Sequence, residues 1–224
     1  MSSRTALIMI DMQNMYLQQE RRSALGWPPI WNFDEVVAEC AELLAAARAQ
    51  GMPVIYTRQT SRADGADATP SMRRLLASSA ASDEESPIGD DADWGSQVLD
   101  AVRPEPGDIV IEKHRWDAFF NTDLDPILRN LDVTRLIVAG LQTNVCVETT
   151  SRTGMMKNFD VAVPLDAVST DGEALHRAAL DSLRVLYVEV APWRELLAED
   201  AEWAQRYTTP GYGRTAEDLA TIGA

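Results

Sequence analysis

Three side chains in this chain of 224 residues have the types and positions that nucleophilic catalysis requires. Asp11 and Lys113 each directly follow a short apolar run, and Cys146 follows another after a brief turn. Such places, past the carboxyl ends of parallel strands, are where α/β proteins usually do chemistry. A Cys146 thiolate would be the nucleophile, Asp11 the acid and base, and Lys113 the cation that favours both anions. The three residues predict a cysteine-based catalytic group, if their strands converge on one crevice.

The surroundings predicted for Cys146 favour a low thiol pKa. A helix is expected to begin at Cys146, and its positive end would favour the thiolate together with Lys113. We therefore expect Cys146 to be alkylated quickly at neutral pH.

Histidine is the more familiar base for a catalytic cysteine, and the chain has only two, His114 and His176. Adjacent residues of an extended strand point to opposite faces, so His114 should face away if Lys113 faces the crevice. His176 falls on a predicted surface helix. A histidine-based mechanism is therefore disfavoured.

The elements that must position these residues follow from the apolar pattern. Short runs rich in Val and Ile predict strands at 6–10, 53–57, 108–112, 135–140, 160–164 and 184–190. The runs are mostly continuous, which is typical of strands buried on both faces of a parallel sheet. Helical patterns lie between the first two strands and at 124–131, 146–157 and 172–183. The alternation predicts one α/β domain over 1–224, with three α/β/α layers and a six-stranded, mainly parallel sheet.

The helix between the first two strands has the clearest boundaries. Its apolar residues recur at helical spacing along one face, and Cys40 is among them, so this cysteine is expected to pack in the core. Asn32 and Glu35 resemble a capping box at its start, and Gly51 stops it before the next strand.

Composition excludes several classes of partner. The chain has 20 Lys+Arg against 35 Asp+Glu and a net charge of −15, which argues against nucleic acids and anionic membranes. Its apolar runs are far shorter than the roughly 20 residues of a membrane helix, and no signal-peptide core is present, so a cytoplasmic location is expected. The two cysteines are far apart and histidines are scarce, so neither disulfides nor a metal site is expected.

Two segments depart from the alternating pattern. Residues 59–95 are rich in Ala, Ser, Asp and Gly, with a short helical pattern at about 72–76 and an acidic cluster after it. They predict either a solvated surface or a lid that sets specificity. The tail, about 207–224, predicts an extension that packs on a neighbouring subunit or frays.

Three stretches carry a resemblance to a known family. They read IMIDMQN at 8–14, EKHRWDAFFNT at 112–122 and AGLQTNVCVET at 139–149. In this order and spacing they resemble the signatures of the isochorismatase-like cysteine hydrolases, over about residues 5–190. The resemblance implies an Asp11–Lys113–Cys146 triad, a cis peptide bond between Leu141 and Gln142, and an oxyanion hole made by the backbone N–H groups of Gln142 and Cys146. It also implies a homo-oligomer, either a dimer or a tetramer.

Within the family, the second and third stretches look most like the branch that cleaves terminal ureido groups, such as ureidoacrylate and N-carbamoyl amidohydrolases. Tyr16 fits that branch. True isochorismatases lack the cysteine, so Cys146 argues against their chemistry. Nicotinamidases carry a metal-binding Asp and two His after the second strand, whereas residues 56–64 here contain no histidine.

The resemblance therefore implies a cofactor-independent amidohydrolase. It would cleave a small amide or terminal carbamoyl C–N bond of a small molecule through a thioester and release ammonia. Tyr16, Trp116, Phe119 and Phe120 are candidate pocket walls or core residues, and Arg58 is a candidate for binding a substrate carboxylate or a solvated side chain.

Other functions stay open. They are a related hydrolase of the maleamate, biuret or nicotinamide type, and a non-catalytic binding protein on the same fold. A flavodoxin-like nucleotide binder is disfavoured, because no Gly-rich loop follows the first strand.

Three positions depart from the family's pattern. Gln142 stands where a smaller residue is commoner, Asp117 where Ser is frequent, and Thr153 in place of an acidic residue. The Gln142 side chain either enters the pocket, where it could bind a carbamoyl group, or faces away.

Overall fold

The computed structural model describes residues 4–17, 22–23, 26–62, 64–78, 94–186 and 188–198. Its strands are β1 (Thr5–Ile10), β2 (Val54–Gln59), β3 (Ile109–Lys113), β4 (Arg135–Leu141), β5 (Asp160–Pro164), β6 (Val168–Ser169) and β7 (Glu189–Ala191). They pair in parallel in the order β3-β2-β1-β4-β5-β7, and β6 adds to β4. The sheet thus has seven strands in these residues rather than the predicted six, because the two residues of β6 are too few to make an apolar run.

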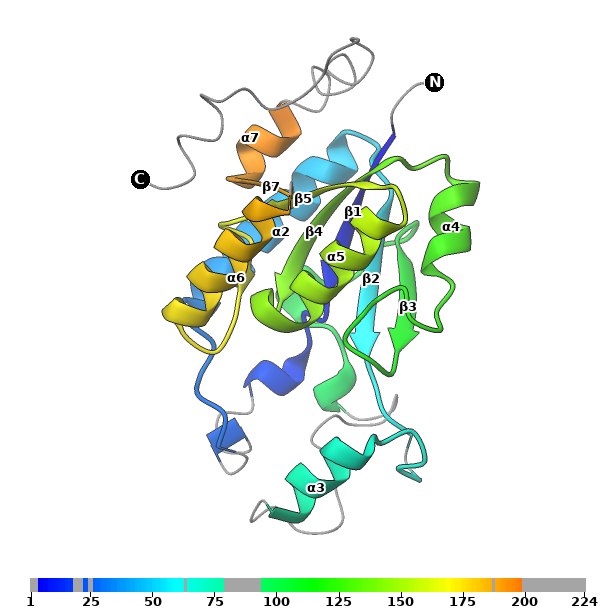
Figure 1. Ribbon diagram of the computed structural model, residues 1–224. Helices are drawn as coiled ribbons and strands as arrows, with labels where there is room; N and C mark the ends of the chain where they lie inside the picture. The colour runs from blue at the N-terminus through cyan, green and yellow to red at the C-terminus, as the bar shows by residue number, and fades with distance from the viewer. Residues whose placement is uncertain are drawn as a thin grey trace.

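Helices cover both faces of the sheet, as the alternating pattern predicts (Figure 1). The helical elements are η1 (Asn14–Leu17), α2 (Phe33–Ala49), α3 (Pro70–Ser78), η2 (Trp94–Ser96), η3 (Asp100–Val102), α4 (Leu124–Asn130), η4 (Thr143–Val147), α5 (Glu148–Met156), α6 (Glu173–Val185) and α7 (Trp193–Ala198). Helices α2 and α7 pack on one face, and α4, α5 and α6 pack on the other. The predicted three-layer α/β/α fold is confirmed.

Each central strand contributes apolar side chains to the hydrophobic cores on both faces of the sheet. Along β1, Leu7 and Met9 pack against α2, whereas Ala6, Ile8 and Ile10 face the α5 and α6 side. Successive side chains of a strand point to opposite faces, so a strand covered on both sides must be apolar throughout.

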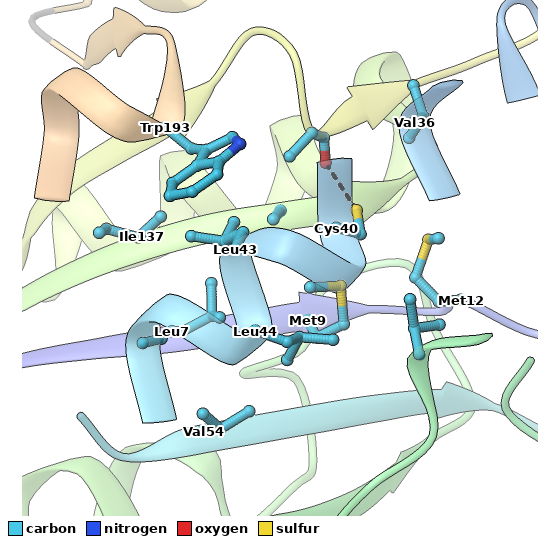
Figure 2. Packing of buried hydrophobic residues seen from close by; sticks show 14 of the residues in the cluster. Leu7, Met9, Met12, Val36, Cys40, Leu43, Leu44, Val54, Ile137 and Trp193 are labelled. Atoms are coloured by element: carbon cyan, nitrogen blue, oxygen red, sulfur yellow. Dashed lines mark hydrogen bonds between the residues drawn. The ribbon is translucent and has the colours of Figure 1, made fainter. Parts of the chain in front are cut away.

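Helix α2 packs across β1, β2 and β4 (Figure 2). Cys40 lies in this layer, fully buried, and its Sγ is 3.3 Å from the backbone oxygen of Ala167. Cys40 is therefore a packing residue, as predicted.

The structure corrects two predicted boundaries. Asn32 has a left-handed backbone, with φ of 49°, and its side chain makes no capping hydrogen bond, so the predicted capping box is wrong. A side-chain cap needs an extended backbone at that position, which Asn32 does not have. The predicted strand at 184–190 is also wrong except at its end: α6 continues through Val185, with Leu180 and Leu183 in the core, and β7 begins at Glu189.

Part of the divergent segment is described. Its predicted short helix is α3, which lies beyond the carboxyl ends of β2 and β3 (Figure 1). Residues 79–93, with the acidic cluster, and the tail at 207–224 lie outside the described residues, so the lid and the packing of the tail stay predictions. Among the described helices, none is long and apolar enough to cross a membrane.

The contact between β1 and β4 depends on a glycine. Gly140 lies opposite Ile10 in the ladder and has a φ of +105°, and a Cβ there would be 2.2 Å from the backbone oxygen of Ile10. Gly107 has nearly the same φ, +107°, but nothing within 4 Å of its Cβ position.

We expect Gly140→Ala to lower the free energy of unfolding by clearly more than Gly107→Ala. Gly107→Ala should cost about 1–2 kcal/mol for the positive φ alone, and the clash at Gly140 should add roughly 1–3 kcal/mol. Urea unfolding of both variants measures the difference. Equal losses would contradict the assigned role of the close contact between the strands.

Candidate active site

Asp11, Lys113 and Cys146 come together at the carboxyl ends of β1, β3 and β4. The Lys113 Nζ lies 2.8 Å from Asp11 Oδ2 and 3.4 Å from Cys146 Sγ. Asp11 and Lys113 are fully buried, and Cys146 is 5% exposed. Strand β2 separates β3 from β1, so the long Lys113 side chain reaches across β2 to Asp11.

A side chain of strand β2 orients the Asp11 carboxylate. Asp11 has a left-handed backbone, with φ of 46°, where the chain leaves β1. The Thr57 hydroxyl donates to Asp11 Oδ1 at 2.6 Å, while Lys113 pairs with Oδ2. The two carboxylate oxygens therefore have different partners and a defined orientation.

Two further side chains of the site, Thr57 and Gln59, were not predicted. The Lys113 ammonium donates to Gln59 Oε1 at 2.6 Å and to the backbone oxygen of Arg115 at 2.9 Å. The signal for them was their alternate spacing at the carboxyl end of β2, which places both on the face of Asp11.

A third unpredicted residue, Gln13, fixes the end of β2. The Gln59 backbone N–H donates to Gln13 Oε1 at 2.8 Å, and Gln13 Nε2 donates to the Gln59 carbonyl at 2.9 Å. Gln13 thus pairs with the backbone of β2 as a further strand would.

The buried cation stays charged. Burial lowers the pKa of Lys113, but the neighbouring Asp11 carboxylate and Cys146 raise it, and the net direction is upward. Lys113 is therefore an ammonium in the resting site.

The expected low thiol pKa of Cys146 is wrong for the resting site. This pKa is raised to about 12, because burial, the largest cause, and the Asp11 carboxylate raise it by more than Lys113 lowers it. Cys146 also lies in the π-helical turn η4, just before α5 begins. The loss of water around the sulfur outweighs the nearby ammonium, so the resting thiol keeps its proton.

The turn that leads to Cys146 contains the cis peptide bond that the family resemblance implies. The Leu141–Gln142 peptide bond is cis. The Gln142 side chain is directed to Asp171, with Nε2 donating to Oδ1 at 2.6 Å, and the Thr170 hydroxyl donates to Asn144 Oδ1 at 2.5 Å. The segment after β6 therefore holds the turn, and the oxyanion hole stays a prediction.

His176 contacts the same turn. It is buried, so the predicted surface position is wrong. It is 5% exposed, and its Nδ1 is 3.1 Å from the Thr143 hydroxyl. His114 Nδ1 instead lies 3.0 Å from the backbone oxygen of Thr60 and faces away from Cys146, as expected.

The candidate pocket aromatics separate into two groups. Tyr16 is buried, and its pKa is raised well above the usual value by burial and by the nearby Cys146 and Asp11. Phe119 is also buried, in the core, with its ring centre 5.8 Å from that of Phe159. Trp116 and Phe120 are 58% and 53% exposed.

Arg58 is not brought to the Lys113 side of the sheet. It lies between Thr57 and Gln59 in β2 and therefore points to the opposite face. Its Nη2 lies 2.5 Å from Glu112 Oε1, and its Nη1 donates to Gln97 Oε1 at 3.1 Å. Within the described residues, no three His, Cys, Asp or Glu side chains are placed to hold a metal ion.

The chain matches known proteins over most of its length. The family model of the isochorismatase domain matches residues 5–195. Over 196 residues the chain is 35% identical to a ureidoacrylate amidohydrolase, RutB, of Methylobacterium radiotolerans, covering 82% of this chain and 74% of that protein. The corresponding protein of Pantoea ananatis is 34% identical, over 82% of this chain and 76% of the relative.

Solved structures share the fold. A cysteine hydrolase from Pseudomonas syringae pathovar phaseolicola has a TM-score of 0.76 and 31% identity, over 90% of this chain and 93% of that one. N-carbamoylsarcosine amidase from Thermoplasma acidophilum has a TM-score of 0.65 at 24% identity, over 85% and 96% of the two chains. By its signatures, its fold and these matches, the chain belongs to the isochorismatase family of hydrolases.

Proposed function

We propose that the chain is a cysteine-dependent amidohydrolase that cleaves a terminal carbamoyl or primary amide C–N bond of a small molecule and releases ammonia. The observation that carries the proposal is the buried Lys113 ammonium, which contacts both the Asp11 carboxylate and the Cys146 thiol. The ureidoacrylate amidohydrolases among its relatives support the substrate class.

The first step is attack by sulfur. Asp11 takes the thiol proton, the sulfur forms a bond to the carbonyl carbon, and the carbonyl π electrons move to oxygen. Lys113 offsets the single negative charge that Asp11 and Cys146 share, so the proton moves between the two groups without a new charge being buried. The backbone N–H groups of Gln142 and Cys146 would donate hydrogen bonds to the developing oxyanion.

The second step releases ammonia. Asp11 returns the proton to the leaving nitrogen, the C–N bond breaks, and a thioester remains on Cys146. Water then hydrolyses the thioester to a carboxylic acid from an amide, or a carbamic acid from a ureido group. Asp11 is the base for that water and is restored with the thiol.

Cys146→Ala should abolish hydrolysis. Ammonia release is measured on ureidoacrylate, N-carbamoyl amino acids, biuret, maleamate and nicotinamide, and the rate on the best substrate should fall at least about 10³-fold without the nucleophile. Cys40→Ala is the matched control, because Cys40 is a buried packing thiol, and it should retain activity. Hydrolysis that persists in Cys146→Ala would contradict the cysteine mechanism.

Asp11→Asn should raise the alkylation rate of Cys146 and lower the rate of substrate hydrolysis. The Asp11 carboxylate raises the pKa of the Cys146 thiol, so its loss should lower that pKa and speed alkylation by iodoacetamide at neutral pH. Hydrolysis should fall about 10²–10⁴-fold, because the acid and base is gone.

Mass spectrometry of Cys146 measures the alkylation. In the wild type the rate should be low at neutral pH and rise with pH, since only the thiolate reacts. Slower alkylation of Asp11→Asn at neutral pH, or unchanged hydrolysis, would contradict the assigned role of Asp11.

A further inference from the structure

The two oxygens of the Asp11 carboxylate differ in their hydrogen bonds. Oδ1 accepts the hydrogen of the Thr57 hydroxyl at 2.6 Å. Oδ2 is buried and accepts no hydrogen bond within the described residues, although the Lys113 Nζ lies 2.8 Å away. A buried polar atom without a hydrogen-bond partner is uncommon in proteins and needs an explanation, of which a catalytic role is one.

The Lys113 ammonium acts on Oδ2 as a charge. Its three N–H groups donate to Gln59 Oε1, the Arg115 backbone oxygen and Cys146 Sγ. The same Nζ lies 2.8 Å from Asp11 Oδ2 and 3.4 Å from Cys146 Sγ. Oδ2 is therefore the carboxylate oxygen that shares the ammonium with the thiol, and it still has room for a hydrogen.

Thr57 contacts both the backbone and the side chain of Asp11. The Asp11 N–H donates to the Thr57 hydroxyl oxygen and to its backbone oxygen, each at 3.2 Å. A hydroxyl has a single hydrogen, and the one on Thr57 goes to Asp11 Oδ1. The register of β1 and β2 places Thr57 opposite Ile10, directly before Asp11, and Thr57 is fully buried. The β-branched side chain has few rotamers, so the sheet fixes where the hydroxyl lies.

We propose that Thr57 is a positioning residue that acts through Asp11: its hydroxyl holds Oδ1, so that Oδ2 is the atom that takes the Cys146 proton and later returns it. The inference rests on the proposed function in that Asp11 is the acid and base for Cys146. It adds which carboxylate oxygen carries the proton and which side chain makes the choice.

The proton transfer assigned to Oδ2 is balanced within the site. The S–H bond of Cys146 breaks, its electron pair stays on sulfur for attack on the carbonyl carbon, and an O–H bond forms at Asp11 Oδ2. That O–H bond later breaks and gives its hydrogen to the leaving nitrogen. Thr57 keeps its own hydrogen throughout, so its contribution is to orientation.

Two substitutions at position 57 test the role of the hydroxyl. Thr57→Val removes the hydroxyl and keeps the branched shape. On the best substrate of the panel, kcat should fall about 10- to 100-fold because the base is no longer aligned. KM should stay within about 3-fold, since the hydroxyl has no part in binding. Thr57→Ser restores the hydroxyl and should return kcat to within about 3-fold of the wild-type value.

Thr153→Val is the matched control. The Thr153 hydroxyl also donates to a carboxylate oxygen, Asp117 Oδ2 at 2.8 Å, on the loop after β3. Its removal should leave kcat and KM within about 3-fold of the wild-type values. A fall in kcat as large as that in Thr57→Val would mean that any lost hydroxyl has this effect, and it would overturn the proposal.

Crystal structures of the two Thr57 variants test the orientation without a substrate. In Thr57→Val the Asp11 carboxylate should turn, because the buried Oδ1 has lost its donor and Lys113 is the adjacent cation. In Thr57→Ser the carboxylate should keep the wild-type orientation. The proposal is wrong if the carboxylate is unmoved in Thr57→Val, if kcat is unchanged there, or if Thr57→Ser fails to restore kcat.

Failure of the proposed function would appear in other samples. It would show as ammonia release that is absent in the wild type, or that persists in Cys146→Ala. The orientation of Asp11 in the crystal structures is independent of both results.

Discussion

Burial of the Lys113 ammonium is the constraint on which the rest of the site depends. A charge removed from water costs several kcal/mol unless an opposite charge and hydrogen-bond acceptors replace the solvent. Asp11 supplies the charge, and Gln59 and the Arg115 backbone oxygen supply the acceptors. Asp11, Gln59 and Arg115 lie at the ends of three different strands. The site therefore forms only when these strands are paired in the sheet. The same burial makes the Cys146 thiol a weak acid, and catalysis then needs a base in contact with it.

The meeting of β1 and β4 places the acid and base next to the nucleophile. Gly140 has no side chain opposite Ile10, so the two strand ends lie close together just where Asp11 leaves β1. From there the chain turns through Gln142 into the helical segment that carries Cys146. Asp171 and its neighbours after β6 hold that turn from outside. The contact between β1 and β4 and the turn before Cys146 therefore act together to place Asp11 next to Cys146.

Two positions at which the sequence departs from the family's pattern contact each other. Asp117 stands where Ser is frequent, and Thr153 where an acidic residue is expected. The Thr153 hydroxyl donates to Asp117 Oδ2 at 2.8 Å, and Asp117 Oδ1 accepts the backbone N–H of Phe119 at 2.9 Å. These hydrogen bonds tie the loop after β3 to α5. In sequence the two changes look independent; only their contact shows that they form a pair.

The sequence by itself determined the alternation of strands and helices apart from β6 and α7, the three layers of the fold and the three residues that meet at the strand ends. These follow from local patterns: apolar runs, helical spacing and chemistry-bearing residues directly after strands. Only the tertiary structure decided that Gln59 joins Lys113, that Arg58 is paired with Glu112 on the other face, and that the thiol of Cys146 is protonated at rest. Those outcomes depend on burial and on partners more than 30 residues away in the chain. A charge's surroundings are set by the whole fold, so no local pattern contains them.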